Sequence, residues 1–387
     1  MIEKIMMKKI YYLICLVISS ISFAKAQDAA DILRKCLNKA NAIKTLSYEV
    51  KNVDKNFFTD DTTNSRWQSV LDFSDTGNIK IINREFSKNN NYKEFYLNDT
   101  SYIFDFSDGT YTKHATLIRY IANDFLDVKA RLEFLLHKKN AKFIQEKDTV
   151  IDNIDCYNIF AKSYDTIVNN EHNFGYTYFY IDKQNLLTIY YKDIGEGAAT
   201  KGGKSIGRIS NFSQKHFYNY VVDKPLDNSI FSINTNQYRL PNNKMLSVGT
   251  KAPSLILKNL LDKNVDSSLF QNKILLVEFG STECPANPLA NPLLNRLFQK
   301  YDEKDVLIFC VYNYETAEQA KKYIQSQHIQ FPVYLGNANL KKNYHAFATP
   351  SFYVINKDEK IVRGDDGYYD DLEKDLTTTI NSLLNKK

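Results

Sequence analysis

The sequence predicts two domains of different fold class: an α+β domain with a curved antiparallel sheet and helices over residues 27–240, and an α/β domain over residues 241–387. Three observations predict this. A chain of 387 residues is long enough for two domains. Before about residue 235, short segments rich in Tyr, Phe and Ile alternate with polar residues, which is typical of antiparallel strands. After Pro241, strand patterns alternate with helix patterns, which indicates βαβ units.

Residues 1–26 have the order of a secretory signal peptide. Three lysines precede the apolar run 10–23, and Ala24-Lys25-Ala26 follows it as a cleavage sequence. The run is shorter than the roughly 20 apolar residues that a membrane span needs. We therefore expect cleavage after Ala26, export across the inner membrane, and a soluble mature protein in the periplasm or cell envelope. Lipidation at Cys15 is not expected, because Ile14 stands where a small residue is required.

Charge and cysteine content exclude several classes of protein. The signal peptide accounts for +3 of the formal net charge of +5, so the mature chain carries about +2 and no nucleic-acid partner is indicated. Four cysteines remain, at positions 36, 156, 284 and 310, with no metal-ligand spacing. The sequence predicts neither a metal site nor a cofactor.

In the first domain, apolar residues recur at helical spacing from Ala29 to Ile43, and a second helical pattern covers Leu117–Leu136. The remaining segments are short and alternate between apolar and polar residues. Strands are predicted at Leu46–Val53, Asn78–Phe86, Tyr92–Leu97, Ser101–Phe106, Tyr157–Ala161, Tyr176–Ile181 and Leu187–Tyr191.

The order of these segments, with the strand at Cys156-Tyr157 and the stretch 179–187, resembles the lipoprotein-carrier-like (LolA-like) half-barrel of cell-envelope proteins. The resemblance covers residues 28–235 and depends on pattern without a specific motif. It implies a curved sheet whose concave face holds an acyl chain or a peptide. The alternative is an aromatic sheet that simply packs on its helices. Cys36 and Cys156 either form a disulfide or lie separately in the core.

The second domain shows the alternation of an α/β fold. Strands are predicted at Leu255–Lys258, Ile274–Phe279, Val306–Tyr312, Phe331–Leu335, Ser351–Ile355 and Lys360–Arg363. Helices are predicted at Asn287–Gln299, Ala317–Gln327, Leu340–His345 and Asp371–Leu384.

Cys284 follows one of these buried strands and a short turn, and it precedes the helix predicted from Asn287. A cysteine at a helix N-terminus faces unpaired backbone N–H groups and the positive end of the helix dipole, which favour the thiolate and lower the thiol pKa. This position predicts a reactive thiol.

Several spaced motifs accompany Cys284, and together they resemble the periplasmic thioredoxin-like proteins of the TlpA and redoxin (AhpC/TSA-like) group over residues 247–387. The motifs are Val248-Gly249-Thr250-Lys251-Ala252-Pro253, Glu278-Phe279, Cys284-Pro285, Pro292, Phe331-Pro332-Val333 and Thr349-Pro350. The resemblance implies a thioredoxin-like fold and thiol–disulfide exchange with Cys284 as nucleophile.

The same resemblance assigns roles to other residues. Glu278 stands where the group has a buried acid that relays a proton, or else it is a strand residue at the domain edge. Pro350 matches a proline that is cis in the group, and the backbone of Thr349 would pair with an extended substrate segment. Pro285 belongs to the same substrate-binding side of the thiol.

The positions at which this sequence differs from the thioredoxin-like group matter as much for its chemistry as the positions that match. Asn287 replaces the second cysteine of the Cys-x-x-Cys motif, and we expect it to donate a hydrogen bond to the sulfur or to contact substrate. Gly280 and Glu283 replace two tryptophans, and the charge of Glu283 should raise the pKa of the Cys284 thiol. Cys310 lies mid-strand, which is too deep for the usual disulfide geometry.

These observations favour monothiol exchange through Cys284, with an outside thiol resolving the mixed disulfide. The partner would be a disulfide-bearing or thiol-bearing envelope protein or a small-molecule thiol. A peroxidase is the weaker enzyme hypothesis, because Val277 and Ser281 replace the Pro and Thr of the peroxidase pattern Pro-x-x-x-Thr-x-x-Cys. The rival hypothesis from another class is a redox-inactive adaptor that uses the same groove, together with the first domain, to bind a peptide, lipid or protein.

Overall fold

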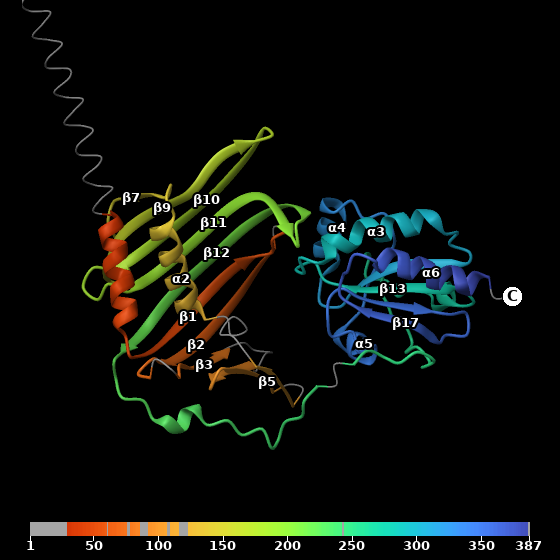
Figure 1. The fold of residues 1–387 in the computed structure, drawn as a ribbon, viewed down its shortest axis with the longest axis horizontal. Coiled ribbons are helices and arrows are strands. Elements are labelled where there is room, and N and C mark those ends of the chain that lie inside the picture. The colour runs from red at the N-terminus through yellow and green to blue at the C-terminus, as the bar shows by residue number, and fades with distance from the viewer. Residues whose placement is uncertain are drawn as a thin grey trace, which may run out of the picture. The chain divides into compact units, whose positions relative to one another are not determined.

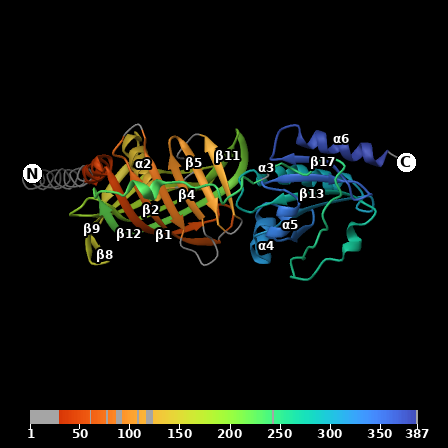
Figure 2. The same cartoon turned by 90° about the horizontal axis from the view of Figure 1, so that it is seen from below.

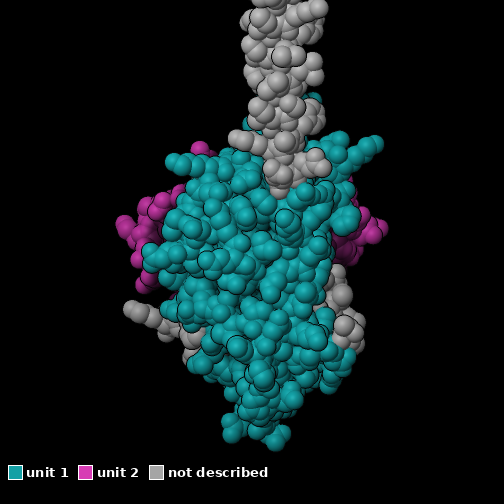
Figure 3. All heavy atoms as spheres, turned by 90° about the vertical axis from the view of Figure 1, so that its left-hand side faces the viewer, with its two compact units in different colours: residues 1–54, 62–197, 211–241 teal, residues 55–61, 198–210, 242–387 magenta. Residues whose placement is uncertain are grey.

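The structure is a computed structural model that describes residues 29–59, 61–75, 78–85, 92–106, 109–115, 123–241 and 244–385. The predicted signal peptide lies outside these residues. The chain divides into two compact units, which Figure 3 colours separately. Unit 1 comprises residues 1–54, 62–197 and 211–241, and unit 2 comprises residues 55–61, 198–210 and 242–387.

Unit 1 is built on a 12-stranded sheet with the order β6-β5-β4-β3-β2-β1-β12-β11-β10-β9-β7, and β8 pairs with β9 (Figure 1). The pairs β1–β12, β2–β3, β3–β4, β4–β5, β5–β6, β7–β9, β8–β9, β9–β10 and β10–β11 are antiparallel. The strands are β1 (Thr45–Lys55), β2 (Thr62–Asp72), β3 (Lys80–Glu85), β4 (Tyr92–Leu97), β5 (Thr100–Asp105), β6 (Thr110–Ala115), β7 (Lys142–Gln145), β8 (Thr149–Ile151), β9 (Ile154–Val168), β10 (Glu171–Asp182), β11 (Thr188–Lys201) and β12 (Lys204–Val222).

One face of this sheet packs on two helices, and β10 shows why. Thr177, Phe179 and Ile181 alternate with partly exposed tyrosines and are buried, because successive side chains of a strand point to opposite faces. The helix over residues 29–42 and α2 (Asp124–His137) contribute apolar residues to the core on that face. Figure 2 shows α2 and the sheet, with β1, β2 and β12 labelled, from below.

The outcome of the strand predictions differs along unit 1. The prediction at Tyr92–Leu97 is confirmed to the residue, but the sequence analysis missed β2 and the 19-residue β12, whose many polar residues hide the alternation. Of the helix predicted at Leu117–Leu136, residues 117–122 lie outside the described residues. The helix begins at Asp124 because Asn123 caps it, with its side chain accepting a hydrogen bond from the backbone N–H of Leu126.

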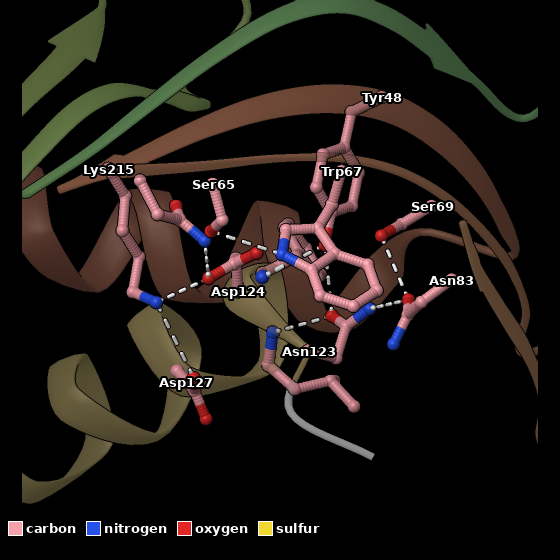
Figure 4. Close-up of polar contacts among 12 residues, drawn as sticks. Tyr48, Ser65, Trp67, Ser69, Asn83, Asn123, Asp124, Asp127 and Lys215 are labelled. Atoms are coloured by element: carbon pink, nitrogen blue, oxygen red, sulfur yellow. Dashed lines mark hydrogen bonds and ion pairs between the residues drawn. The ribbon is translucent and has the colours of Figure 1, made fainter. Parts of the chain in front are cut away.

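A buried ion pair fastens α2 to the sheet (Figure 4). Lys215 of β12 is 8% exposed, and its ammonium forms an ion pair with Asp124 and lies 3.6 Å from Asp127 Oδ2. Asn52 Nδ2 donates to Asp124 Oδ1 over 3.0 Å. Burial lowers the pKa of Lys215, but the negative charge and hydrogen bond of Asp124 outweigh burial, so the pKa is raised.

The cap residue Asn123 continues this network toward β1, β2 and β3 (Figure 4). The Tyr48 hydroxyl donates to Asn123 Oδ1 over 3.1 Å, and Asn123 Nδ2 donates to Asn83 Oδ1 over 3.1 Å. Ser69 Oγ donates to the same Asn83 oxygen over 2.9 Å. Polar side chains from three strands therefore fix the start of α2.

Unit 2 contains a five-stranded sheet with the order β15-β14-β13-β16-β17. The three strands β13, β14 and β15 run parallel, whereas β16 and β17 pair antiparallel. The strands are β13 (Ile274–Gly280), β14 (Val306–Tyr312), β15 (Val333–Leu335), β16 (Ser351–Ile355) and β17 (Ile361–Asp366). The central strands β13, β14 and β16 are buried along their whole length, which explains their continuous apolar runs.

Helices cover both faces of this sheet. The helices α3 (Asn287–Lys300), α4 (Ala317–Ser326) and α6 (Leu372–Leu384) contribute to one apolar cluster, and α5 (Ala338–Asn343) contributes to the cluster on the other face. The described residues also contain two short 3₁₀ helices. The first, η2 (Asn228–Phe231), lies in unit 1, and the second, η3 (Ser267–Phe270), lies in unit 2. All four helices predicted for this domain are present.

The strand predicted at Leu255–Lys258 is wrong. Lys258 makes isolated bridges with Asn264 and Leu335, but the segment joins no ladder. Leu257 is 2% exposed whereas Ile256 is 74% exposed, so a single leucine anchors an otherwise irregular segment.

Cys36 and Cys156 are both free, buried thiols. The structure therefore contains two separate core cysteines and no disulfide between them. Within the part of the chain that the structure describes, no helix is long and apolar enough to cross a membrane.

Candidate functional site

Cys284 lies in the turn that joins β13 to α3. Its Sγ donates a hydrogen bond to the backbone oxygen of Thr349 over 3.0 Å, and the side chain is partly exposed. The helix begins at Asn287, whose backbone N–H donates to the carbonyl of Cys284 over 3.1 Å. The thiol therefore stands three residues before the helix, and its hydrogen bond goes to Thr349 and not to a backbone N–H of the helix.

The segment that faces the thiol contains a cis peptide bond between Thr349 and Pro350, which confirms the predicted geometry. Pro350 is buried, and its carbonyl accepts from Gly367 N over 2.8 Å, so this carbonyl is occupied within the fold. Thr349 is partly exposed and presents its carbonyl to the sulfur. Pro285 is partly exposed beside Cys284. That Pro285, Thr349 and Pro350 bind substrate remains a prediction.

Glu278 lies beneath this turn and is 0% exposed, so the predicted buried position is confirmed and the domain-edge alternative is wrong. Its Oε1 accepts from Asn287 Nδ2 over 2.9 Å. Burial raises the pKa of Glu278 to about 7, and the neighbouring Cys310 thiol opposes this rise by a smaller amount. Such a carboxyl gains or loses a proton near neutral pH, which suits a proton relay.

The expected role of Asn287 needs a correction. Its amide was predicted to donate to the sulfur or to contact substrate, but Nδ2 donates to Glu278 and Oδ1 accepts from Ser281 N over 3.4 Å. The side chain is 0% exposed. As the first residue of α3 it points under the turn, because the apolar face of α3 packs on the sheet there. Asn287 thus positions the acid.

Gly280 explains one departure from the thioredoxin-like group. A Cβ at this position would lie 2.7 Å from Asn287 Nδ2, 2.9 Å from Cys310 Sγ and 3.0 Å from Tyr312 Cε1. Such contacts are too close, so a larger residue at this position would require these neighbouring side chains to shift. Cys310 itself is buried and pairs with Glu278 in the parallel register of β13 and β14. Burial, followed by the Glu278 charge, raises the pKa of the Cys310 thiol well above its usual value.

Charged residues that the sequence analysis missed surround the active turn. Glu315 Oε1 accepts from Thr282 N over 2.9 Å, and partial burial together with the Glu315 charge raises the pKa of Glu283. Burial lowers the pKa of Lys341, although Glu315 and Cys284 oppose this shift. The Lys341 ammonium lies 5.4 Å from the ring centroid of Tyr314, which is 70% exposed. Glu315 follows shortly after the carboxyl end of the strand predicted at Val306–Tyr312, and this position is the sequence signal that could have identified it.

Residues Asn56 and Phe58 of unit 2 also contact elements at this site. Asn56 Nδ2 donates to Thr282 Oγ1 over 3.2 Å, and the rings of Phe58 and Tyr323 meet edge to face with centroids 6.0 Å apart. More than 220 residues separate Asn56 from Thr282 in the chain. No sequence spacing indicates such a contact.

Comparison with known proteins agrees with this geometry. The AhpC/TSA family pattern matches residues 248–363. The C-terminal part of the chain is an AhpC/TSA family domain. Among curated proteins, it is similar to the thiol-disulfide oxidoreductase ResA of Bacillus thuringiensis subsp. konkukian (strain 97-27), with 27% identity over 119 residues, or 30% of this chain and 69% of the relative. The ResA protein of Bacillus anthracis is 26% identical over 118 residues, which are 30% of this chain and 68% of the relative.

Solved structures include two similar proteins. The thioredoxin domain of the thiol-disulfide oxidoreductase BVU-2223 from Bacteroides vulgatus is 22% identical, with a TM-score of 0.33 and coverage of 35% of this chain and 99% of that one. A thiol:disulfide interchange protein of the thioredoxin family from Chlorobium tepidum TLS is 19% identical, with a TM-score of 0.32 and coverage of 36% and 99%. Both curated relatives are thiol-disulfide oxidoreductases by name.

Proposed function

We propose that the AhpC/TSA family domain carries out monothiol thiol–disulfide exchange through Cys284. The observation that carries this proposal is the position of the sulfur. It lies 3.0 Å from the carbonyl oxygen of Thr349 at a cis-proline turn, above the buried Glu278, with Asn287 where a second cysteine would stand. An extended segment that pairs with Thr349 would bring its own sulfur next to Cys284.

The exchange proceeds in two balanced steps. The Cys284 thiolate attacks one sulfur of a partner disulfide, so that a mixed disulfide forms, the old S–S bond breaks, and the leaving thiolate takes a proton. An outside thiolate then attacks the mixed disulfide and releases Cys284, since Asn287 offers no sulfur to resolve it. These two steps join the outside thiol to the partner sulfur in a new disulfide. Attack by a second outside thiolate on the outside sulfur of that disulfide releases the partner thiol, and two electrons have then passed from two outside thiols to the partner disulfide.

Glu278 supplies acid–base chemistry at this site. Because its pKa is near 7, it holds a proton in part of the molecules at neutral pH and takes or gives one as the sulfur changes state. Asn287 holds the carboxyl through a hydrogen bond to Oε1. Both residues act from beneath the thiol and do not touch a bound partner.

The proposed setting is the periplasm or cell envelope, reached through the signal sequence of residues 1–26. The partner is a disulfide-bearing or thiol-bearing envelope protein, or a small-molecule thiol. For unit 1 we propose a lipid or peptide ligand. What supports it is a large antiparallel sheet that packs on helices, the layout that the resemblance to lipoprotein-carrier-like domains implies.

The test is to trap the mixed disulfide. The mature protein is incubated with an oxidised model peptide, quenched by alkylation, and analysed by peptide mass spectrometry. We expect a peptide adduct on Cys284 in the wild type and in the matched Cys310→Ser variant, but not in Cys284→Ser. If the wild type forms no adduct while all three proteins are folded and still bind the peptide, the domain is a redox-inactive binding module and the proposal is overturned.

A further inference from the structure

The turn that holds Cys284 has little apolar surface of its own. Residues 280–283 are Gly280, Ser281, Thr282 and Glu283, and none of them carries a large apolar side chain. A segment with few buried apolar contacts opens easily unless hydrogen bonds hold it. Ser281, Glu283 and Cys284 are at least partly exposed, whereas Thr282 is 1% exposed. The position of the thiol therefore depends on what holds Thr282.

Two contacts hold Thr282, and they come from different parts of the chain. Its backbone N–H donates to Glu315 Oε1 over 2.9 Å, and its Oγ1 accepts from Asn56 Nδ2 over 3.2 Å. Glu315 lies within residues 248–363, the span of the AhpC/TSA family domain, but Asn56 lies far outside it. A residue that the family domain does not contain thus anchors the active turn.

Asn56 has a fixed orientation, because it closes the loop between β1 and β2. Its backbone N–H donates to the carbonyl of Asp61 over 2.9 Å, and its Oδ1 accepts from the backbone N–H of Phe58 over 2.9 Å. This local hydrogen bond is that of an Asx-turn. Since Oδ1 is held within the loop, Nδ2 of the same amide can point in one direction only, which is toward Thr282.

The loop itself is fastened to the rest of unit 2 by three contacts of different kinds. Phe58 is 8% exposed, and its ring meets that of Tyr323 edge to face with centroids 6.0 Å apart. The Lys322 ammonium lies 3.0 Å from Asp61 Oδ1. The backbone N–H of Ser210 donates to the Phe57 carbonyl over 3.2 Å. The loop is therefore a fixed support from which Asn56 can position the turn.

The position of Thr282 determines that of Cys284 through a tight turn. The backbone N–H of Cys284 donates to the Ser281 carbonyl over 3.3 Å, and Cys284 Sγ donates to the Thr349 carbonyl over 3.0 Å. A displacement of a reacting group by about 1 Å can slow a positioned reaction by about 100-fold. Small movements of Thr282 therefore matter for chemistry at the sulfur.

We propose that Asn56 is a positioning residue for Cys284. Its Nδ2 holds Thr282 so that the sulfur stands beside the Thr349 carbonyl, where an extended partner segment pairs. The effect on exchange rests on the proposed function, whereas the hold on the turn does not. Asn56 acts through Thr282 and takes no part in proton or electron transfer.

The first experiment measures hydrogen–deuterium exchange of the backbone amides in residues 281–284 of the full mature chain. In Asn56→Ala the turn loses one of its two anchors, so we expect its amides to exchange about fivefold faster or more. The matched control is Asn259→Ala. Asn259 makes the same loop contact, with its Oδ1 accepting from the backbone N–H of Leu261 over 2.9 Å, and its loss should leave the turn unchanged.

The second experiment compares two reactions of Cys284 in the same proteins. Mixed-disulfide formation with an oxidised model peptide requires pairing at Thr349, whereas alkylation by iodoacetamide does not. We expect Asn56→Ala to slow the peptide reaction about threefold to tenfold and to change the alkylation rate less than about twofold. A merely structural loss would change both rates together.

A double-mutant cycle tests whether the effect passes through this one contact. Thr282→Val removes the acceptor and keeps the shape of the side chain, so it should slow the peptide reaction about as much as Asn56→Ala. The double variant should be no slower than either single variant, because both changes remove the same hydrogen bond.

Three results decide between the possibilities. Unchanged amide exchange in the turn of folded Asn56→Ala overturns the proposal, and so do additive losses in the double variant. If the wild type forms no mixed disulfide while amide exchange in the turn still rises in Asn56→Ala, the proposed function fails and Asn56 remains the anchor of the turn.

Discussion

Each unit buries a carboxylate that lies beside the first turn of a helix, but the two carboxylates have opposite surroundings. In unit 1, Asp124 opens α2 and is held by the Lys215 ammonium and by Asn52. In unit 2, Glu278 faces the first residue of α3, and its Oε1 accepts a hydrogen bond from the neutral side-chain amide of Asn287. The first acid pairs with a cation, whereas no such ion pair to the second is present among the residues that the structure describes.

The difference teaches which buried acid is structural and which is poised to react. A buried charge with a hydrogen-bonded counter-charge stays ionised and fastens the fold, and removing its partner is costly. A buried acid without a cation keeps its proton to higher pH, as the raised pKa of Glu278 shows. Perturbed groups of the second kind concentrate at reactive sites, and here the acid lies beneath Cys284.

The largest effect is expected from Lys215→Met, which leaves Asp124 buried without its cation. Breaking such a pair costs about 3–5 kcal/mol. Denaturant unfolding of the full chain, followed by a probe in unit 1, measures the loss. The control is Lys251→Met, because that side chain is 78% exposed in its pair with Glu359 and should matter little. Equal losses in the two variants would contradict the structural role of the buried pair.

The next effect concerns the pH dependence of unit 2. Because the pKa of Glu278 rises from 4.5 to about 7 on folding, the folded state binds more protons than the unfolded state between these values. The stability of unit 2 should therefore fall as pH rises through this window, by about 3 kcal/mol from this residue. Glu278→Gln should lose this slope. The measurement is the free energy of unfolding of the wild type and of Glu278→Gln at pH 4.5, 6 and 8. If the free energies of the two proteins depend on pH in the same way, Glu278 does not titrate in this window.

Asn287→Ala should have a smaller effect that is specific to the acid. It removes the donor to Glu278 Oε1, which costs about 1–3 kcal/mol for a buried acceptor left unpaired. The same change should raise the pKa of Glu278 further, since a hydrogen bond to the ionised form is lost. Asn295→Ala on the same helix removes a donor to the His328 carbonyl and serves as control. A carboxyl titration that responds equally to both variants would rule out a specific Asn287 contact.

The smallest effect is expected at the surface charge beside the thiol. Glu283→Gln removes a carboxylate whose charge repels anionic reagents, so alkylation of Cys284 by iodoacetate should speed up about twofold to fivefold relative to neutral iodoacetamide. Glu318→Gln, at a side chain that is 79% exposed on α4, should leave that ratio unchanged. A ratio insensitive to Glu283 would mean that its charge is not felt at the sulfur.

The strands and the turn that hold the reactive site could be predicted from the sequence, for physical reasons. Fully buried strands such as β14 and β16 consist of continuous apolar residues and are visible as such. Cys284 was predicted from its position between a buried strand and a helix, and the cis bond at Pro350 was implied by the resemblance to the thioredoxin-like group. The same resemblance implied a buried position for Glu278, with the domain edge as the alternative.

The contacts that give these residues their properties were not predictable from spacing. Asn287 was expected to donate a hydrogen bond to the Cys284 sulfur. The expectation was wrong because the sequence does not show in which direction the side chain of the first helix residue points. The pairing of Lys215 with Asp124 spans 91 residues, and that of Asn56 with Thr282 spans 226. β12 contains Lys215 and was itself missed, since its polar face obscures the apolar one.

The most direct test of the account is the alkylation rate of Cys284 against pH, read by peptide mass spectrometry in the wild type and in Glu278→Gln. If Glu278 titrates beneath a reactive thiol, the wild-type profile has an inflection near pH 7 that the variant lacks. Identical profiles in the two proteins, or no labelling of Cys284 in the folded state, would contradict the claim that this buried acid and this thiol form one reactive site.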